Sequence, residues 1–157
     1  AGGGAIFLGD TSKTVVKHSQ LAYNSAESFG GAVYATSYSK VLMEDCFFTS
    51  CSTTAVGGAI FAQDFAHVDI VGSTLKNHTA TSSGGALAYV GGSHGSVLNT
   101  AFQDNSAMGK GGAVDVGQFA APVFREVSFS QNNAGVGGAI SCKNYANVTV
   151  SNCTIVE

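Results

Sequence analysis

Apolar residues recur in this chain at fixed positions of a repeat of about 27 residues. Each repeat begins with Gly-Gly-Ala and an aliphatic residue, and the first glycines are Gly3, Gly30, Gly57, Gly84, Gly111 and Gly137. Counted from that glycine, positions 4 and 6, 12 and 14, and 17 and 19 are apolar or small in most repeats. A spacing of two indicates β-strands, because successive side chains of a strand point to opposite faces.

Short strands separated by glycine, serine and asparagine predict a parallel β-helix. A fixed period of 26–27 residues is typical of a solenoid, in which each repeat packs on its neighbours. The predicted fold is therefore all-β: a single right-handed parallel β-helix of about six coils, with three short strands per coil. The right-handed sense follows from the strong preference of parallel crossovers for that hand.

The repeats occupy the whole chain, so we predict one β-helix segment over residues 1–157. Solenoids need atypical terminal repeats that cover their apolar ends, and neither the first nor the last repeat departs from the pattern. We therefore expect the segment to belong to a longer chain or to an assembly.

Glycine and asparagine mark the predicted turns. The Gly-Gly pair fits a corner where positive φ or a close approach of backbone excludes a Cβ atom. A polar residue at position 22 predicts an asparagine ladder, in which each side chain bonds to backbone and to its neighbour in the next coil. Its members are Asn24, His78, Asn105 and Asn132, with Cys51 in the second repeat.

Composition acts mainly by excluding functions. Charged residues make up 11% of the chain and the formal net charge is −3, so we expect no nucleic-acid partner. No apolar run reaches the 18 residues that a membrane-spanning helix needs. No set of residues indicates a metal or another cofactor. His67 and His94 share position 11 in adjacent repeats, but they lack a third ligand.

The chain has four cysteines, Cys46, Cys51, Cys142 and Cys153, all at positions expected to face inward. Cys46 and Cys153 share position 17 but lie four coils apart, about 19 Å along the axis, which is too far for a disulfide. Pairing is feasible within a coil, between Cys46 and Cys51 and between Cys142 and Cys153. The alternative is four buried thiols that pack as small hydrophobes.

Three N-x-Thr sequons make Asn77, Asn147 and Asn152 candidates for glycosylation. Each of these asparagines is adjacent to an inward position, so each is expected to face solvent. Sequons also arise by chance in a chain rich in serine, threonine and asparagine. Together with paired cysteines, they favour a secreted, glycosylated eukaryotic protein, located outside the cell or on its surface.

Catalysis on a β-helix surface would require clustered carboxylates. Polysaccharide lyases and hydrolases on this fold use them as acid and base or to hold calcium. The acidic residues here are scattered over different positions, and outward position 5 carries one carboxylate, Asp115. We therefore predict that the protein is not an enzyme. A carbohydrate-active enzyme or a glycan-binding module is the alternative.

Aromatic side chains are the remaining surface feature. Phe7, Tyr34 and Phe61 occupy position 5 in three consecutive repeats and are predicted to form an exposed stripe, a candidate interaction surface. Alternatively, their stacking only stiffens the sheet. A second aromatic set, at position 9, is expected to pack at a corner. Its members are Tyr38, Phe65, Phe119 and Tyr145.

Two motifs carry a resemblance to a known family. The Gly-Gly-Ala-aliphatic phrase is accompanied by Phe-x-x-Asn at residues 102–105 and 129–132. This combination resembles the repeats of the chlamydial polymorphic membrane proteins, and similar repeats occur in other secreted β-helix proteins. The resemblance implies a surface-exposed β-helix passenger that acts as an adhesin.

The function expected from these features is a non-catalytic structural or adhesive module outside the cell. It would act in a cell-surface adhesin or as a building block of an extracellular fibre. The expected partner is a protein or glycan surface, or further copies of the chain stacked end to end.

Overall fold

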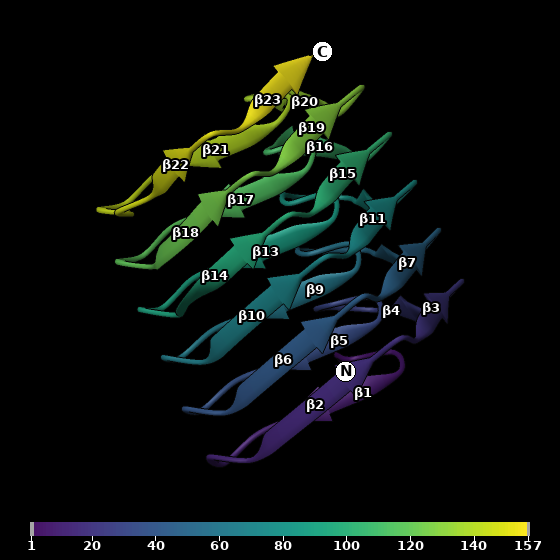
Figure 1. Cartoon of the computed structure of the whole chain (residues 1–157), viewed down its shortest axis with the longest axis vertical. Coiled ribbons are helices and arrows are strands. Elements are labelled where there is room, and N and C mark those ends of the chain that lie inside the picture. Colours follow the sequence, from purple (N-terminus) through teal and green to yellow (C-terminus); the bar gives the residue numbers. More distant parts are fainter. Residues whose placement is uncertain (1, 157) are drawn as a thin grey trace.

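The 27-residue period corresponds to one coil of a parallel β-solenoid in a computed structural model that describes residues 2–156 (Figure 1). Strands of successive coils pair in parallel and in register, as in Ile6 with Val33 and Val33 with Ile60. About six coils are stacked along the long axis, and the two ends of the chain lie at opposite ends of the stack (Figure 1). The fold class and the number of coils predicted from the sequence are confirmed.

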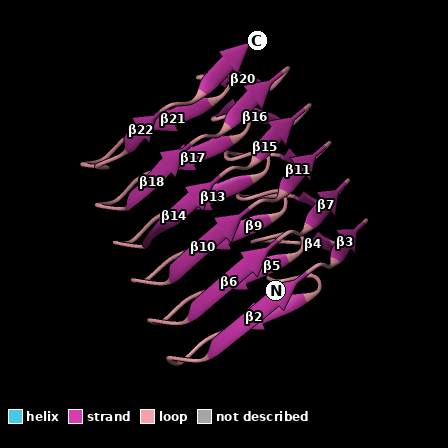
Figure 2. Cartoon of the chain, in the orientation of Figure 1, coloured by secondary structure: helices cyan, strands magenta, loops and turns pink. Residues whose placement is uncertain are grey.

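Four sheets run along the solenoid, and in the described residues only strands and loops are drawn (Figure 2). The first sheet contains β1 (Ile6–Leu8), β5 (Val33–Ala35), β9 (Ile60–Ala62), β13 (Leu87–Tyr89), β17 (Val114–Val116) and β21 (Ile140–Cys142). The second contains β2 (Lys13–Lys17), β6 (Lys40–Glu44), β10 (His67–Val71), β14 (His94–Leu98), β18 (Ala121–Arg125) and β22 (Thr149–Ser151).

The third sheet contains β3 (Gln20–Ala22), β7 (Phe47–Thr49), β11 (Thr74–Lys76), β15 (Ala101–Gln103), β19 (Ser128–Ser130) and β23 (Thr154–Val156). The fourth contains β4 (Ser25–Ala26), β8 (Ser52–Thr53), β12 (Thr79–Ala80), β16 (Ser106–Lys110) and β20 (Asn133–Val136). Over residues 2–156, no helix is long and apolar enough to cross a membrane.

The fourth sheet corrects the prediction of three strands per coil. Its first three strands have two residues each, with the sequences Ser-Ala, Ser-Thr and Thr-Ala. Two residues are too few to display an alternation of apolar and polar positions. These strands form because equivalent backbone groups of adjacent coils meet in register, whatever the side chains are. The right-handed sense of the coil stays a prediction.

The core consists of like side chains stacked from coil to coil. Position 4 of the repeat is fully buried in Val33, Ile60, Leu87 and Val114. On the third sheet, Phe102 and Phe129 stack with ring centroids 5.2 Å apart. Burial of each such side chain stabilises the fold by roughly 1.5–3 kcal/mol. The inward orientation predicted for these positions is confirmed.

The Gly-Gly pair is required by two different constraints. At the first glycine, φ is positive, +71° at Gly57, a conformation that favours glycine. At the second, a Cβ atom would overlap backbone of the next coil: at Gly58 it would meet the carbonyl oxygen of Gly85. The same overlap recurs at Gly31 and Gly112. The corner therefore allows the coils to approach closely, and this explains why the pair recurs in every repeat.

The fifth repeat, which runs from Gly111 to the next repeat at Gly137, is one residue shorter than the others. The difference is absorbed where β16 pairs with β20, as a shift of register between Ala107 and Lys110. The following strand, β21, pairs with β17 without a shift. The deletion is thus confined to one corner of one coil.

Candidate interaction surfaces

The aromatic residues at position 5 form a cluster on the outer face of the first sheet, and their exposure decreases along the cluster. Ring centroids are 5.4 Å apart between Phe7 and Tyr34 and 5.6 Å apart between Tyr34 and Phe61. Phe7 is 62% exposed, whereas Phe61 is only 3% exposed. The expectation that all three face solvent is therefore wrong for Phe61. Phe29 covers it, stacked with a centroid distance of 4.8 Å and an interplanar angle of 15°.

Phe29 was not predicted because its position carries no repeated residue type. The last position before each Gly-Gly pair holds phenylalanine, valine, serine and lysine in the first four repeats. Single parallel bridges join Phe29 to Val56, Val56 to Ser83, and Ser83 to Lys110. The bridges form a short additional ladder just before the strands of the first sheet. Phe29 is the aromatic residue of this ladder among the described residues. Periodicity cannot reveal a contact that occurs once.

The aromatic residues at position 9 form the exposed set. They lie in the turns between the first and second sheets, with φ between 61° and 64°. Tyr38 stacks on Phe65, and Phe119 on Tyr145, each pair with centroids 5.2 Å apart and rings 8° from parallel. Their exposed fractions range from 52% to 83%. We call these four residues the aromatic ladder. The expectation that they pack at a corner is wrong, since the turn directs the rings to solvent.

The aromatic ladder is interrupted in the fourth coil, where Gly92 replaces an aromatic residue. The interruption leaves a groove of about 530 Å³ between Phe65 and Phe119, with Asp64, Gly91 and Gln118 at its sides. The exposed aromatic surface is therefore divided into two stacked pairs with an apolar recess between them.

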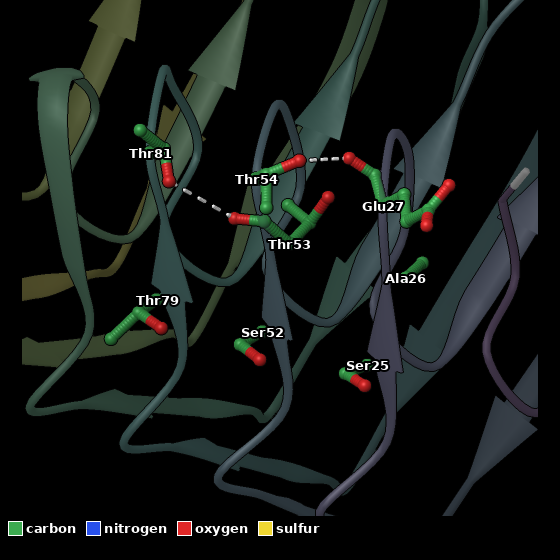
Figure 3. A pocket seen from close by; sticks show the side chains of 8 residues that line it. All are labelled: Ser25, Ala26, Glu27, Ser52, Thr53, Thr54, Thr79 and Thr81. Atoms are coloured by element: carbon green, nitrogen blue, oxygen red, sulfur yellow. Dashed lines mark hydrogen bonds between the residues drawn. The ribbon is translucent and has the colours of Figure 1, made fainter.

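A hydroxyl-lined groove of about 420 Å³ runs over the fourth sheet. Ser25, Ser52 and Thr79 follow one another on successive coils at its base (Figure 3). The hydroxyl group of Thr54 donates a hydrogen bond to the carbonyl of Glu27, as Figure 3 shows. Among the described residues that line the groove, Glu27 is the one ionisable side chain. Hydroxyl groups without a base or a second acid can bind polar partners, but they do not form an acid–base pair.

Several carboxylates pair with basic groups of the same or an adjacent coil. Glu44 lies 2.6 Å from Lys17. Asp69 accepts a hydrogen bond from Nε2 of His67 at 2.8 Å. Asp115 is 1% exposed, although position 5 lies on the outer face of the sheet, and it accepts a hydrogen bond from Lys143 Nζ at 2.7 Å. In each of these three pairs one carboxylate lies beside one basic group.

Position 22 forms a continuous hydrogen-bonded row within the solenoid. Asn105 Nδ2 donates to Oδ1 of Asn132 at 3.0 Å and to the carbonyl of Leu75 at 3.0 Å. One coil earlier, Oδ1 of Asn105 accepts from the backbone N–H of His78 at 3.0 Å. Asn24, in the first coil, is half-buried. The buried members of the row thus fasten the turn before the fourth sheet to the neighbouring coil.

The four cysteines are free thiols in the described chain, so neither predicted disulfide is present. The two buried thiols point to backbone of the preceding coil instead of to each other. Sγ of Cys46 lies 3.4 Å from the carbonyl oxygen of Val16, and Sγ of Cys51 lies 3.5 Å from that of Leu21. Cys142 is exposed and Cys153 is half-buried, unlike the inward pair that the sequence predicted.

The three sequon asparagines, Asn77, Asn147 and Asn152, are all exposed. Their glycosylation stays a prediction. The imidazole rings of His67 and His94 lie 4.7 Å apart in an edge-on arrangement. Across residues 2–156, no three side chains of the metal-binding types come together in a potential metal site.

Residues 126–143 match the family model of the Chlamydia polymorphic membrane protein repeat. The matched segment contains Phe129 and Asn132 of the second Phe-x-x-Asn motif and the Gly-Gly-Ala-Ile phrase that starts at Gly137. In the structure, the matched segment runs from the turn before β19, through β20, to the end of β21. The motifs on which the resemblance rested are therefore those that the family model recognises. Neither the curated proteins nor the solved structures contain a match to the chain.

Proposed function

We propose that this chain is a non-catalytic, extracellular β-solenoid module that presents a rigid, repetitive surface to a partner at the cell surface. The observation that carries the proposal is the aromatic ladder of Tyr38, Phe65, Phe119 and Tyr145, whose rings are stacked and more than half exposed. Exposed aromatic patches of this kind mark interaction sites on soluble proteins. The match to a repeat of surface-associated membrane proteins supports the same location.

The arrangement of the ladder favours binding over a purely structural role. Each ring sits on a turn between a first-sheet strand and a second-sheet strand, and both strands pair in parallel with an adjacent coil. Rings held in this way lose little conformational entropy when a partner covers them. The expected partner is a protein or glycan surface that offers flat apolar groups at the spacing of the coils, about 4.8 Å.

Adhesion measurements on ladder variants test the proposal. Beads coated with the protein are expected to bind cultured epithelial cells, and replacement of all four ladder residues by serine should lower the bound fraction at least tenfold. Tyr23→Ser is the matched control, because Tyr23 is an exposed aromatic residue outside the ladder. Undiminished adhesion of the ladder variant would refute the proposal.

The module could serve in a cell-surface adhesin or in an extracellular fibre. In the fibre, copies of the chain would stack end to end through the unpaired edges of the four sheets, since free strand edges favour further pairing. Electron microscopy of the purified protein separates the two settings: filaments with a continuous axial repeat support the fibre, and single particles support the adhesin.

A carbohydrate-active enzyme is the alternative function from a different class. Cleavage of an acidic polysaccharide that disappears in Asp115→Ala would favour it over the module proposed above. Within residues 2–156, Asp115 pairs with Lys143 and not with a second carboxylate, which supports a non-catalytic function.

A further inference from the structure

A pocket lies on the outer side of the first sheet, over the fourth coil. It has a volume of about 290 Å³, and its lining combines aromatic rings, amides and an ion pair. The residues used below are Phe29, Phe61, Asp115, Gln118 and Lys143, all of which line it. Pockets that join an apolar wall to a few convergent polar groups are typical of small-ligand sites.

The pocket exists because the fourth coil carries small residues where its neighbours carry large ones. Ala88 in β13 pairs with Phe61 on one side and with Asp115 on the other. Its side chain ends at Cβ, so the space between the phenyl ring and the carboxylate is left unfilled. Ser83, just before the fourth repeat, lies between Val56 and Lys110 in the adjoining bridges. Its small side chain also leaves space unfilled between these two larger residues.

Asp115 supplies an unused hydrogen-bond acceptor. Its side chain is almost wholly buried, and Oδ2 accepts a hydrogen bond from Lys143 at 2.7 Å. Oδ1 is buried and has no hydrogen-bond partner among the described residues. A buried carboxylate oxygen without a donor is destabilising, because it has lost its bonds to water. A ligand hydroxyl group that donates to Oδ1 would remove this cost.

The charges in the pocket select a neutral ligand. Asp115 and Lys143 are the two ionisable groups among the described lining residues, and they neutralise each other. A charged ligand would therefore bring an uncompensated charge into a mostly buried site. The remaining polar groups are amides and hydroxyls, which both donate and accept hydrogen bonds. Phe29, stacked on Phe61, offers an apolar wall.

We propose that this pocket binds a neutral sugar residue. One sugar hydroxyl donates to Asp115 Oδ1, and another accepts from the ammonium of Lys143 or the amide of Gln118. The C–H face of the sugar ring packs against the apolar wall formed by Phe29 and Phe61. Gln118 is exposed and the Lys143 side chain is 31% exposed, so the ligand enters past these two side chains.

The sugar site is distinct from the aromatic ladder on which the proposed adhesive function rests. Gln118 lines both the pocket and the groove at Gly92, but no ladder residue lines the pocket in the described chain. Substitution of the ladder is therefore expected to leave sugar binding unchanged. The two proposals can fail independently.

Titration with neutral monosaccharides tests the site. The full chain is mixed with glucose, galactose, mannose or N-acetylglucosamine, and binding is followed by saturation-transfer NMR and calorimetry. At least one of these sugars should bind. Asp115→Asn and Gln118→Gly should each weaken binding about tenfold, the loss expected for one hydrogen bond to a charged or well-placed group. Glycine already occupies the position equivalent to Gln118 in the fourth coil, as Gly91.

Glu44→Gln is the matched control, because the Glu44–Lys17 pair also joins adjacent coils but lies away from the pocket. It should bind sugar like the unaltered protein. Circular dichroism establishes that each variant is folded, and Gln118→Gly keeps the test decisive if Asp115→Asn does not fold. Binding of none of the four sugars, or unchanged affinity in the folded pocket variants, would each overturn the proposal.

Discussion

The backbone N–H of Cys51 donates a hydrogen bond to Nδ1 of His78, 3.0 Å away in the next coil. Nδ1 can accept this bond only when it carries no proton. His78 is fully buried, and Nε2 has no hydrogen-bond partner in the described chain. Burial lowers the pKa of His78 to about 4. The turn is thus built for a neutral imidazole.

This arrangement predicts that the protein becomes less stable as the pH falls from about 6.5 to about 4. The unfolded chain binds a proton at His78 near pH 6.5, whereas the folded chain does so only near pH 4. Between these values the unfolded state binds more protons, so acidification favours unfolding. The loss should reach about 3 kcal/mol at the lower limit. Urea unfolding at pH 7 and pH 4.5 measures it.

His78→Asn is the control for the pH effect. In Asn105 and Asn132, Nδ2 donates to the carbonyl of the residue thirty positions earlier, and for Asn at position 78 that residue is Phe48. The variant should therefore be at least as stable as the original at pH 7 and should lose most of the decline below pH 6.5. An unchanged pH profile would show that other groups cause it.

Gly58→Ala should destabilise the solenoid by about 3 kcal/mol or more. The new Cβ would overlap the carbonyl oxygen of Gly85, and relief requires two coils to separate. Gly117→Ala is the matched control, since its Cβ would meet the flexible side chain of Lys143 at 3.3 Å. Thermal unfolding followed by circular dichroism compares the two. Equal melting temperatures would contradict the role assigned to the corner.

Gly92→Tyr should complete the aromatic ladder. Residues of the same type already adopt this backbone conformation at Tyr38 and Tyr145, with φ of 61° and 62°. A Cβ at Gly92 would lie 2.6 Å from the Phe65 ring, so that ring must swing back. Each new aromatic contact contributes about 0.5–1.5 kcal/mol. Gly92→Ala is the control, because its Cβ crowds the Phe65 ring but alanine has no ring that could stack on it. The tyrosine variant should therefore melt at the higher temperature, and the reverse order would argue against a stacked ladder.

The cysteines should react with iodoacetamide in an order set by exposure. Cys142 is exposed and should be alkylated first, while Cys46 and Cys51 are buried and should react only after unfolding. Burial raises the pKa of the Cys51 thiol and so slows its reaction further. Mass spectrometry of the labelled protein follows the order. Failure to label four thiols in denaturant without a reductant would show that disulfides form after all.

Much of the fold could be read from the sequence because the solenoid repeats its requirements. Position 4 is buried in the core, so it holds an aliphatic residue, such as Val33 or Ile60, in every coil. Six repeats are enough to reveal this pattern in the sequence. The short strands of the fourth sheet escaped prediction because backbone pairing alone determines them. Such pairing leaves no alternation in the sequence.

The surfaces were harder to predict because they depend on contacts that occur once. Phe61 was expected to face solvent and is covered by Phe29. Asp115, at the same position two coils later, was expected on the surface and is buried beside Lys143. Alternation gives the face of the sheet on which a side chain lies, but not whether a turn from another part of the coil covers that face.

The one-residue deletion in the fifth repeat illustrates how such a chain can change its length. The register shift is confined to the stretch between Ala107 and Lys110, and pairing between β17 and β21 is undisturbed. Since each coil touches only its neighbours, a change of length in one coil leaves the pairing of the other coils intact. The length of the solenoid is therefore set by the number of coils, at about 4.8 Å per coil. The outer residues of each coil can differ without changing that length.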